Sequence, residues 1–462
     1  MPSFFQNKTL LCIALTVIAV SAKCTVLASP VPSSPPKTPL KGIVLWVDEA
    51  RDHPELRNAV SLEFAYLTPA SMVHGTNADG TIRYDWSPLE SLLDDIASRG
   101  DQAILRFRYE YPGEKSKDAP GARGATGVPR HIKAMPGYHE TFSPNPGGDG
   151  PTWYADWSHA GLRDFTLRFY ADFADRYDRD PRLAFLEVGF GHWSEYHISG
   201  TPVQLGKNFP SLEFQAQLMR LLDGKLKETP WCVSIDAAQR KYASLAHDPA
   251  LSALGFGLFD DSFMHKEHDI AQGDGYNERC WRAFGTDRWR RAPCGGEISY
   301  FSSRDQRQFL DPKGLYGVTW EQAAAKYHMT FVIANDSLDG KFATPERLAE
   351  AAAHCGYAFR LVSAATERDA LVVEIANDGV APVYHDVRPS LDGVAADASL
   401  RGLEPGTTRT FRIATPAPPN TDTAARLRLL SPKLLPGAEL PLVRYGVSAA
   451  LPSTPPFEIS GF

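Results

Sequence analysis

What the sequence lacks narrows the classes of protein that it can encode. Beyond one apolar stretch near the N-terminus, no run of apolar residues is long enough to span a membrane. Neither the Gly-x-Ser-x-Gly turn of serine hydrolases nor the His-Glu-x-x-His segment of zinc proteases occurs. Basic residues are not in excess, with 48 Lys and Arg against 55 Asp and Glu. Because phosphate binding needs a basic face, nucleic acid is not expected as a partner.

The N-terminal apolar stretch has the features of a secretory signal peptide. Lys8 supplies positive charge, Leu10–Ala22 is apolar but short for a membrane span, and Val26-Leu27-Ala28 resembles a cleavage site. We therefore expect residues 1–28 to be removed and the mature protein to be secreted or periplasmic, with an uncleaved membrane anchor as the alternative. Loss of Lys8 and Lys23 changes the formal net charge from −7 to −9.

Cysteine is scarce, and two of the six cysteines leave with the predicted signal peptide. No pair has the spacing of a zinc site, and we expect neither a metal nor a cofactor. Cys280 and Cys294 flank a short loop rich in Trp and Arg, so they are the expected disulfide in an oxidising compartment. Cys232 and Cys355 are expected to be buried thiols.

Residues 29–40 are a Pro/Ser-rich linker, after which apolar runs begin to alternate with helix-like segments. The runs are rich in Val, Ile, Phe and Leu, which is typical of parallel strands buried on both faces. Eight such runs occur, at Ile43–Val47, Val60–Leu67, Ala103–Tyr109, Leu183–Phe190, Cys232–Ala237, Phe256–Phe259, Gly295–Tyr300 and Met329–Ala334. Helices are predicted between several of them, at Ser87–Ser98, Leu162–Tyr177, Leu212–Leu226, Trp320–Tyr327 and Pro345–His354.

This alternation over residues 41–355 predicts an α/β fold, a (β/α)8 TIM barrel. A doubly wound open sheet is the alternative, but no glycine-rich phosphate loop follows the first strand. The third strand-to-helix connection, from about Tyr111 to Ala160, is unusually long. We expect it to lie over the C-terminal rim and to form part of a substrate groove, with disorder as the alternative.

Beyond residue 355 the apolar pattern changes to a period of two, interrupted by turn signals such as Asp392-Gly393 and Pro436-Gly437. Residues 356–462 are therefore predicted to form an all-β, immunoglobulin-like sandwich. Such a sandwich either binds glycan or packs against the barrel, and packing is favoured because no aromatic platform is evident. Its strands are expected at Tyr357–Ala364, Ala370–Ala376, Val383–Ser390, Thr408–Ile413, Leu427–Leu430 and Leu442–Val447.

Two carboxylates stand out at the ends of predicted strands. Phe185–His197 (FLEVGFGHWSEYH) is an apolar strand that breaks at two glycines and ends beside Glu195, and Cys294–Phe301 (CGGEISYF) carries Glu297. Carboxyl ends of barrel strands meet at one rim, where active sites lie. Cleavage of a glycosidic bond needs two carboxyl groups, one to protonate the leaving oxygen and one to attack or to activate water.

This layout resembles the clan of retaining (β/α)8 glycoside hydrolases, which has its acid/base Glu after strand 4 and its nucleophile Glu on strand 7. The resemblance implies that Glu195 is the acid/base and Glu297 the nucleophile. One departure is Ser194, where the clan usually has Asn. Glu195 also lies beyond a Gly-His-Trp turn, further along the chain than the strand tip.

Residues 41–390 also resemble an uncharacterised family of secreted bacterial proteins. That family joins a glycosidase-like barrel, with a Gly-x-Trp-x-Glu and a later Gly-Glu segment, to a C-terminal β-sandwich. The matching residues are Gly191, Trp193 and Glu195, then Gly296 and Glu297, then Gly356-Tyr357, Ala376-Asn377-Asp378-Gly379 and Ala381-Pro382.

Further side chains are expected to line the same rim and bind substrate. Arg106 and Arg108 share one face of a strand, and buried arginines need anionic partners. Asp260, Asp261 and His265 are a weak metal pattern, because their spacing specifies no metal. The predicted substrate-binding residues are Trp46, Asp48, Arg106, Arg108, Tyr109, His192, Trp193, Tyr196, His197, Asp236, Asp260, Asp261, Tyr300 and Asn335.

The sequence therefore predicts an exported protein that acts on an oligo- or polysaccharide, most simply a glycoside hydrolase of retaining mechanism. A glycan-binding or cell-surface protein on a glycosidase scaffold is the alternative, motivated by Ser194. A separation of the two carboxyl groups of about 5 Å fits a retaining enzyme, and roughly 6.5–9.5 Å an inverting one. A buried salt bridge that occupies Glu195 would favour the binding protein.

Overall fold

The computed structural model describes most of the chain from residue 37 to residue 444. The described residues are 35, 37–110, 112, 126–145, 148, 150–198, 200–239, 241–266, 268–269, 273–334, 340–367, 369–415 and 426–444. The predicted signal peptide, most of the predicted linker and Asn335 lie outside them. No helix in these ranges combines the length and the apolar character that a membrane span requires.

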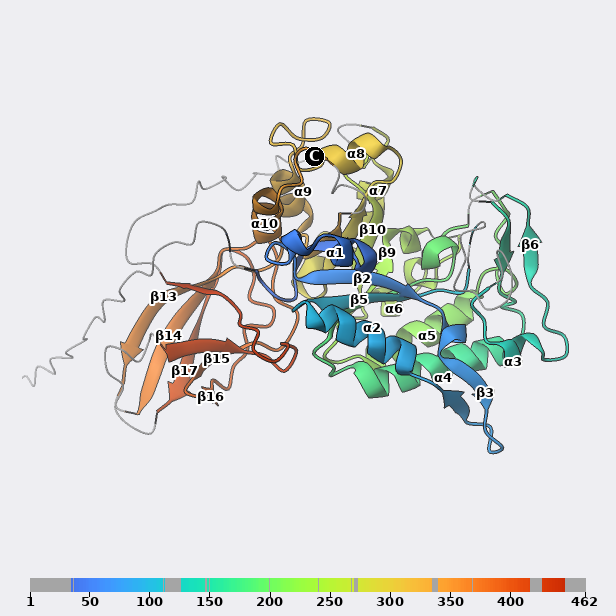
Figure 1. Ribbon diagram of the computed structural model, residues 1–462, viewed down its shortest axis with the longest axis horizontal. Helices are drawn as coiled ribbons and strands as arrows, with labels where there is room; N and C mark the ends of the chain where they lie inside the picture. Colours follow the sequence, from blue (N-terminus) through green and yellow to red (C-terminus); the bar gives the residue numbers. More distant parts are fainter. Residues whose placement is uncertain are drawn as a thin grey trace, which may run out of the picture.

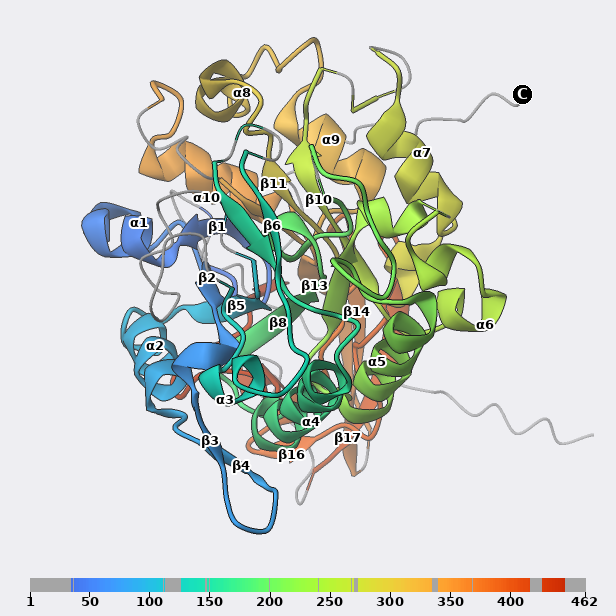
Figure 2. The same ribbon diagram turned by 90° about the vertical axis from the view of Figure 1, so that its right-hand side faces the viewer.

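Eight parallel strands close into a barrel, in the order β1-β12-β11-β10-β9-β8-β5-β2 (Figure 2). Each strand coincides with one of the eight predicted apolar runs, which confirms the (β/α)8 barrel and excludes the open sheet. The first strand of the barrel, β1, pairs with both the last strand, β12, and the second, β2: Val44 lies opposite Ile333 and Leu62. The strands are β1 (Gly42–Trp46), β2 (Leu62–Leu67), β5 (Gln102–Phe107), β8 (Leu183–Val188), β9 (Trp231–Ser234), β10 (Gly257–Phe263), β11 (Cys294–Ile298) and β12 (Phe331–Ile333).

Helices surround the barrel, and the five predicted ones form within one or two residues of their expected bounds (Figure 1). In α2, Pro88 occupies the first turn and Leu89, Leu93 and Ile96 face the core. The helices are α1 (Val47–Asp52), α2 (Ser87–Ser98), α3 (Arg130–Lys133), α4 (Ala160–Tyr177), α5 (Leu212–Lys225), α6 (Pro249–Ser252), α7 (Tyr276–Ala283), α8 (Ser303–Gln308), α9 (Trp320–Tyr327) and α10 (Pro345–Ala353).

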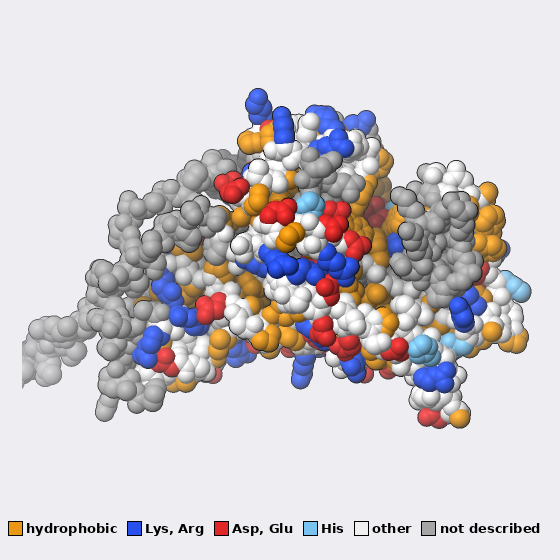
Figure 3. Space-filling model, in the orientation of Figure 1, with side chains coloured by type: hydrophobic (Ala, Val, Ile, Leu, Met, Phe, Trp, Pro, Cys, Tyr) orange, Lys and Arg blue, Asp and Glu red, His pale blue; other side chains and the backbone are white. Residues whose placement is uncertain are grey.

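Charges of both signs are interspersed on the face that carries α1 and α2 (Figure 3). Arg51 and Arg99 both contact Asp95 there, at 2.8 Å in each case. Arg99 also pairs with the buried Glu63 at 2.7 Å. The charge of Glu63 is therefore compensated by Arg99 from the helix layer and not by Arg106 inside the barrel.

The interior of the barrel changes character from one end to the other. Its amino-terminal half is filled by apolar side chains, including Ile104, Phe185 and Phe331, each fully buried. Further along the same strands come Arg106 and Glu187, also fully buried, which face each other across the β5–β8 pair. The carboxyl half of the barrel interior therefore carries buried charge, whereas the amino-terminal half is packed with apolar side chains.

Beyond the barrel, two sheets enclose a second hydrophobic core. Phe359, Val373 and Phe411 from one sheet meet Leu391 and Leu429 from the other. The predicted sandwich is confirmed, although β16 was not expected. One sheet has the order β17 (Thr408–Ala414), β14 (Ala370–Asn377), β13 (Phe359–Thr366), β19 (Leu442–Arg444), and the other β16 (Val394–Ala395), β15 (Arg388–Leu391), β18 (Leu427–Leu430).

The sandwich packs against the amino-terminal end of the barrel (Figure 1). His385 Nε2 lies 3.0 Å from the carbonyl oxygen of Ala184 at the start of β8, and its ring contacts Phe185. Lys433 Nζ donates to the carbonyl oxygens of Asp178 and Asp180, and Leu434 packs against the barrel interior. The sandwich thus closes the end of the barrel opposite to the buried charges.

The predicted disulfide is not formed. Cys280 and Cys294 are not bonded to each other: both are buried free thiols, as are Cys232 and Cys355. Cys280 lies on α7 and Cys294 starts β11, so each is fixed by its own element.

The described part of the long third connection contains α3 and a hairpin of β6 (Thr141–Ser143) and β7 (Thr152–Tyr154). This hairpin lies beyond the carboxyl ends of the barrel strands (Figure 2). The other small hairpin, β3 (Val73–Thr76) with β4 (Ile82–Tyr84), extends outward below the helices α2 and α4 (Figure 1).

Candidate active site

A cavity of about 880 Å³ opens at the carboxyl ends of the barrel strands. Carboxylates and aromatic rings line it together, the combination that sugar hydroxyls and the apolar faces of sugar rings need. Its lining residues are Trp46, Tyr66, Trp193, Glu195, His197, Asp236, Gln239, Asp261, Ser262, His265, Asp274, Tyr276, Asn277, Glu297, Tyr300 and Phe301.

The turn after β8 carries Glu195 back over the mouth of the barrel. Trp193 and Ser194 both take left-handed backbone angles, with φ of 54° and 62°. The chain returns so closely that a Cβ on Gly189 would lie 1.8 Å from the carbonyl oxygen of Ser194. One on Gly191 would lie 1.9 Å from that of His197. Only glycine fits at these two positions, which explains the Gly-x-Gly sequence before the turn.

Hydrogen bonds close this turn from both sides. The backbone N–H groups of Phe190 and Gly191 donate to the carbonyl oxygen of Glu195 at 3.0 and 2.6 Å. The hydroxyl of Ser194 donates to the carbonyl oxygen of Phe107 at 2.7 Å. Ser194 is therefore a buried structural residue that ties the turn to β5. Its side chain does not line the cavity.

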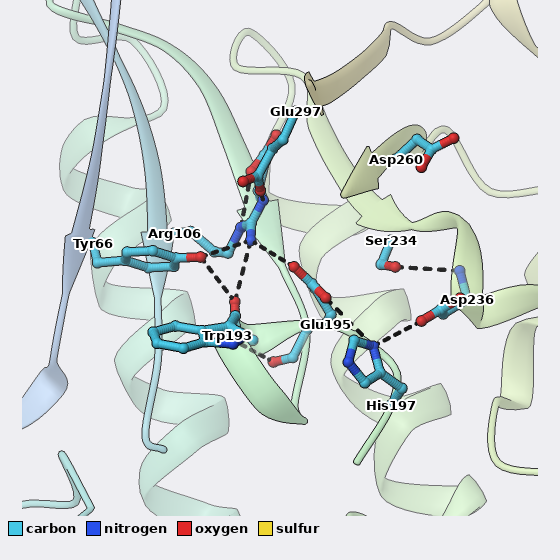
Figure 4. A network of polar contacts seen from close by, with 12 residues as sticks. Tyr66, Arg106, Trp193, Glu195, His197, Ser234, Asp236, Asp260 and Glu297 are labelled. Atoms are coloured by element: carbon cyan, nitrogen blue, oxygen red, sulfur yellow. Dashed lines mark hydrogen bonds and ion pairs between the residues drawn. The ribbon is translucent and has the colours of Figure 1, made fainter. Parts of the chain in front are cut away.

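Arg106 is the centre of the site (Figure 4). Its guanidinium is fully buried and donates to Oε2 of Glu187 at 2.5 Å, to Oε1 of Glu297 at 2.7 Å and to Oε1 of Glu195 at 3.3 Å. Because the last two contacts meet on one planar guanidinium, the bonded oxygens of Glu195 and Glu297 are at most about 8 Å apart. This limit includes the separation of about 5 Å that retaining glycosidases use and the lower part of the range of roughly 6.5–9.5 Å that inverting ones use.

Arg106 also fixes the turn itself. Its Nη1 donates to the carbonyl oxygen of Trp193 at 3.2 Å and to the hydroxyl of Tyr66 at 2.9 Å. Tyr66 in turn donates to the same carbonyl at 3.4 Å. One cation therefore positions both the backbone before Glu195 and the side chains of the three glutamates.

A single cation cannot balance three buried carboxylates, so their protonation states must differ. Burial raises the pKa of Glu187 to about 7 and raises that of Glu297, while Arg106 opposes the rise in both. Burial, and then the charge of Asp261, hold the pKa of Glu195 well above its usual range. Glu195 also has the longest contact with Arg106. It is the group best suited to carry a proton, while Glu297 is the better suited to remain charged.

Beside Glu195 lies a second acidic group of the cavity wall. Asp261, near the end of β10, lines the cavity beside Glu195, and its charge contributes to the rise in the pKa of Glu195. Burial and the charge of Asp236 raise the pKa of Asp261. Burial would also raise the pKa of Asp236, but hydrogen bonds from His197 and Tyr276 outweigh it and leave that pKa below its usual value.

The cavity wall beside Glu195 also contains three potential metal ligands. Glu195, His197 and Asp261 each place one potential ligand atom within 4.8 Å of the others. Nδ1 of His197 lies 2.8 Å from Oδ2 of Asp236 and 3.4 Å from Oε2 of Glu195 (Figure 4). Because Nδ1 carries the proton of its hydrogen bond to Asp236, a metal ion would have to break that bond. The donor set does not fit a resident metal centre.

Most of the predicted site residues come together in or directly beneath the cavity. Those that line it are Trp46, Trp193, Glu195, His197, Asp236, Asp261, Glu297 and Tyr300. Arg106 lies beneath them, and the guanidinium of Arg108 stacks on the rings of Tyr66 and Trp193 at 4.0 and 5.0 Å. The two arginines thus share one face of β5, as their spacing predicts.

Five predicted residues are not in the cavity. The side chain of Asp48 is 82% exposed and pairs with Arg51 on α1. Tyr109 turns toward the helices and bonds Thr166, while Tyr196 packs on Met219. Both predictions were wrong because successive side chains point to opposite sides of an extended chain, so a neighbour of a site residue faces away from the site.

The side chains of the other two predicted residues, His192 and Asp260, are buried outside the cavity. His192 is buried, bonded to the hydroxyl of Tyr154 at 2.7 Å. Asp260 accepts hydrogen bonds from Asn277 and Trp281 of α7, and it lies apart from the network around Arg106 (Figure 4). Asp260 therefore anchors a helix, and the adjacent Asp261 is the one that reaches the cavity.

Several cavity residues escaped the sequence analysis. Tyr66 could have been found, because it lies two residues from Phe64 on the inward face of β2. The others come from the chain after β9, the end of β10, the segment before α7 with the first turn of that helix, and the chain after β11. No periodic pattern in these places reveals the direction of a side chain. The unpredicted residues are Tyr66, Gln239, Ser262, Asp274, Tyr276, Asn277 and Phe301.

Fold and site together define a closed (β/α)8 barrel with a cluster of buried carboxylates at the carboxyl ends of its strands. No family model matches the sequence, and no curated protein matches it. The similar solved structures include glycoside hydrolases. Endo-glycoceramidase II from Rhodococcus sp., as its lactosyl-enzyme intermediate, aligns over 84% of this chain and 100% of its own, with 14% identity and a TM-score of 0.41.

Two other similar structures share still less sequence. The catalytic domain of β-amylase from Paenibacillus polymyxa is 9% identical with a TM-score of 0.39, over 65% of this chain and 93% of its own. A GH5_18 protein from Bifidobacterium longum subsp. infantis is 11% identical with a TM-score of 0.38, over 69% and 77%. Identity and TM-score are low throughout, so the chemistry of the site has to be inferred from its own side chains.

Proposed function

We propose that the protein is an exported glycoside hydrolase that cleaves an oligo- or polysaccharide with retention of configuration. Glu297 is the nucleophile and Glu195 the general acid and base. The observation that carries the proposal is that one buried guanidinium bridges two cavity-lining carboxylates, with a closer contact to Glu297 than to Glu195. Export is supported by the signal-like N-terminal sequence.

The charge distribution assigns the two roles. A nucleophile must be ionised, and Arg106 at 2.7 Å from Glu297 stabilises the carboxylate form. A general acid must be protonated at working pH, and burial beside Asp261 holds the pKa of Glu195 well above its usual range. Neighbouring carboxyl groups whose pKa values are pushed apart in this way can act as an acid and a base in one site.

The reaction follows from this arrangement. Glu195 gives its proton to the glycosidic oxygen while Oε2 or Oε1 of Glu297 bonds to the anomeric carbon, and the leaving sugar departs as an alcohol. Glu195, now ionised, takes a proton from water, which attacks the anomeric carbon and releases Glu297. Arg106 holds the charge of Glu297 before bond formation and after its release.

Aromatic side chains provide a surface for the sugar rings. Trp46, Trp193 and Tyr300 line the cavity, and Nε1 of Trp46 donates to the hydroxyl of Tyr300 at 3.2 Å. Phe301 is 72% exposed at the edge of the same cavity. Rings of this kind stack on the apolar faces of sugars and exclude water from the bond that is cut.

The proposal is tested with Glu297→Ala and a panel of aryl glycosides. We expect turnover to be lost and partly restored by azide or formate, which replace the missing carboxylate and leave a glycosyl azide or formate product. Proton NMR of the wild-type reaction should show the first-formed sugar with the configuration of the substrate. Asp94→Asn removes one carboxylate from the surface of α2, where its side chain is 72% exposed, and serves as the control. Undiminished turnover in Glu297→Ala would refute the assignment.

A second candidate is a glycan-binding protein, and one observation favours it. Both glutamates are engaged by Arg106, and Glu195 is only 3% exposed, so the buried ion pairs have a structural role of their own. In that case wild type and Glu297→Ala would both fail to cleave any glycoside in the panel. Both would still bind an oligosaccharide, measured by calorimetry, with dissociation constants that depend on Trp193.

A further inference from the structure

The walls of the cavity are strongly acidic. Carboxylates of five residues line it, whereas neither Lys nor Arg appears among the described lining residues. The acidic residues are Glu195, Asp236, Asp261, Asp274 and Glu297. Arg106 lies beneath them, and its donors are already used by Glu187, Glu297, Glu195, Tyr66 and the carbonyl oxygen of Trp193.

The acidic charge is concentrated on one side, where β9 and β10 end. Asp236 and Asp261 project there next to Glu195. When His197 is protonated, it pairs with Asp236 at 2.8 Å and with Glu195 at 3.4 Å. Such a wall repels the carboxylates of uronic and sialic acids and attracts a positive group. A neutral sugar would leave the acidic charge uncompensated.

An acceptor in this wall also lacks a hydrogen bond. Oε2 of Glu195 has no hydrogen-bond partner among the described residues, although Glu195 is 97% buried and lines the cavity. Buried acceptors are normally satisfied, so an empty one points to a donor that the ligand brings. Its nearest charged neighbours are His197 Nδ1, at 3.4 Å, and the Asp261 carboxyl.

We propose that this wall, formed by Asp261, Asp236 and Glu195, receives the ammonium group of an amino sugar. The inference rests on the proposed function and specifies its substrate class: a glycan with a free amine on the sugar bound next to Glu195. An ammonium fits better than a metal ion, because it adds donors without displacing the proton that His197 shares with Asp236.

The ammonium also fixes the proton that the acid needs. Asp261 lines the cavity beside Glu195, and its charge contributes to the raised pKa of Glu195. An ammonium beside Asp261 stabilises that carboxylate in its ionised form, and the ionised Asp261 in turn favours a proton on Glu195, next to the glycosidic oxygen. Neutral substrates lack this device, so the amine contributes to turnover as well as to binding.

The test compares aryl glycosides of one ring configuration that differ only in bearing a hydroxyl, an amine or an acetamide at carbon 2. The series is run for gluco, galacto and manno rings. We expect kcat/KM for the amine to exceed that for the hydroxyl compound by about tenfold or more, and this ratio to fall as salt is added. Uronic acid glycosides should be the poorest substrates.

Asp261→Asn is the variant that separates this idea from a general effect of charge. The amine-to-hydroxyl ratio should fall close to one in Asp261→Asn and stay unchanged in Asp94→Asn, which removes the same charge from the surface of α2. Equal rates for amine and hydroxyl compounds in the wild-type protein would overturn the proposal. So would a preference that survives Asp261→Asn in a variant whose thermal unfolding matches the wild type.

Binding measurements keep this test independent of turnover. Chitosan oligosaccharides, which carry amines, and cello-oligosaccharides, which do not, are titrated into the wild-type protein by calorimetry with and without EDTA. Tighter binding of chitosan that EDTA leaves intact supports the ammonium site even if no glycoside is cleaved, in which case the hydrolase alone fails. Equal affinities, or a preference abolished by EDTA, would overturn it.

Discussion

Nη2 of Arg106 lies 2.7 Å from Oε1 of Glu297, inside a barrel whose neighbouring side chains are almost completely buried. The same nitrogen also contacts Glu187 at 2.5 Å. Arg106 further stacks on the ring of Phe259, 4.2 Å from its centroid. Arg106 therefore fixes the position of the Glu297 carboxylate, and Glu187 and Phe259 in turn fix the position of Arg106. This arrangement requires that charged groups be buried.

The first prediction concerns this buried cation. Arg106→Met leaves Glu187 and Glu297 without their counter-charge, and breaking a buried pair in this way costs about 3–5 kcal/mol. We expect urea denaturation to show a loss of this size, together with loss of turnover. The double variant Arg106→Met/Glu187→Met removes both partners and should recover part of the stability without recovering activity. A single variant that loses less than about 1 kcal/mol would contradict the buried network.

The second prediction is a change in the pH profile of kcat/KM. The alkaline limb should report Glu195, whose pKa is raised by burial and by Asp261, against the opposing charge of Arg106. Asp261→Asn removes the neighbouring negative charge, so the pKa of Glu195 falls and the alkaline limb moves to lower pH by about one unit. Asp94→Asn should leave the profile in place. A shift to higher pH would mean that Asp261 does not act on Glu195.

The third prediction concerns the contact between sandwich and barrel. Burial, and then the charge of Lys433, lower the pKa of His385 to about 3 from a usual value of 6.5. The folded protein thus keeps His385 neutral while the unfolded chain takes up a proton below pH 6.5. Stability is complete above this pH and is lost as the pH falls toward 3, by about 2–3 kcal/mol between pH 6.5 and 4.5.

His385→Gln removes this titration. Urea denaturation at the two pH values should show a smaller loss for the variant than for the wild type. His74→Gln, at a histidine whose side chain is 59% exposed, should behave like the wild type. If wild type and His385→Gln lose stability equally, the histidine is not buried in its neutral form.

Much of the fold follows from local sequence patterns. Strands buried on both faces are short apolar runs and helices carry an apolar stripe, so their alternation specified the barrel almost residue by residue. Glu195 and Glu297 could be predicted because the first follows a strand-like run and the second lies on one. Their placement could not be predicted from the sequence, because it depends on Arg106. This residue lies on β5 and contacts β8, the turn after β8, and β11.

The predicted site residues that lie outside the cavity are ones whose position depends on the direction of the side chain. Tyr109 lies two residues from Phe107, which faces the helices, so a consistent alternation along β5 would have placed it outside the barrel. Asp260 and Asp261 are adjacent, and only the register of β10 against β11 determines which one enters the cavity. Cys280 and Cys294 are close in sequence, but each is held by a different element. Proximity along the chain does not specify proximity in space.

The last prediction tests the turn that places Glu195. In Gly189→Ala the new methyl group would lie 1.8 Å from the carbonyl oxygen of Ser194, so the turn has to open and Glu195 moves away from Arg106. We expect kcat to fall by about a hundredfold or more, because catalytic groups tolerate little displacement. Gly224→Ala is the matched control, since no atom lies within 4 Å of its added Cβ on α5 and alanine favours a helix. Wild-type turnover in Gly189→Ala would show that the position of Glu195 does not depend on this turn.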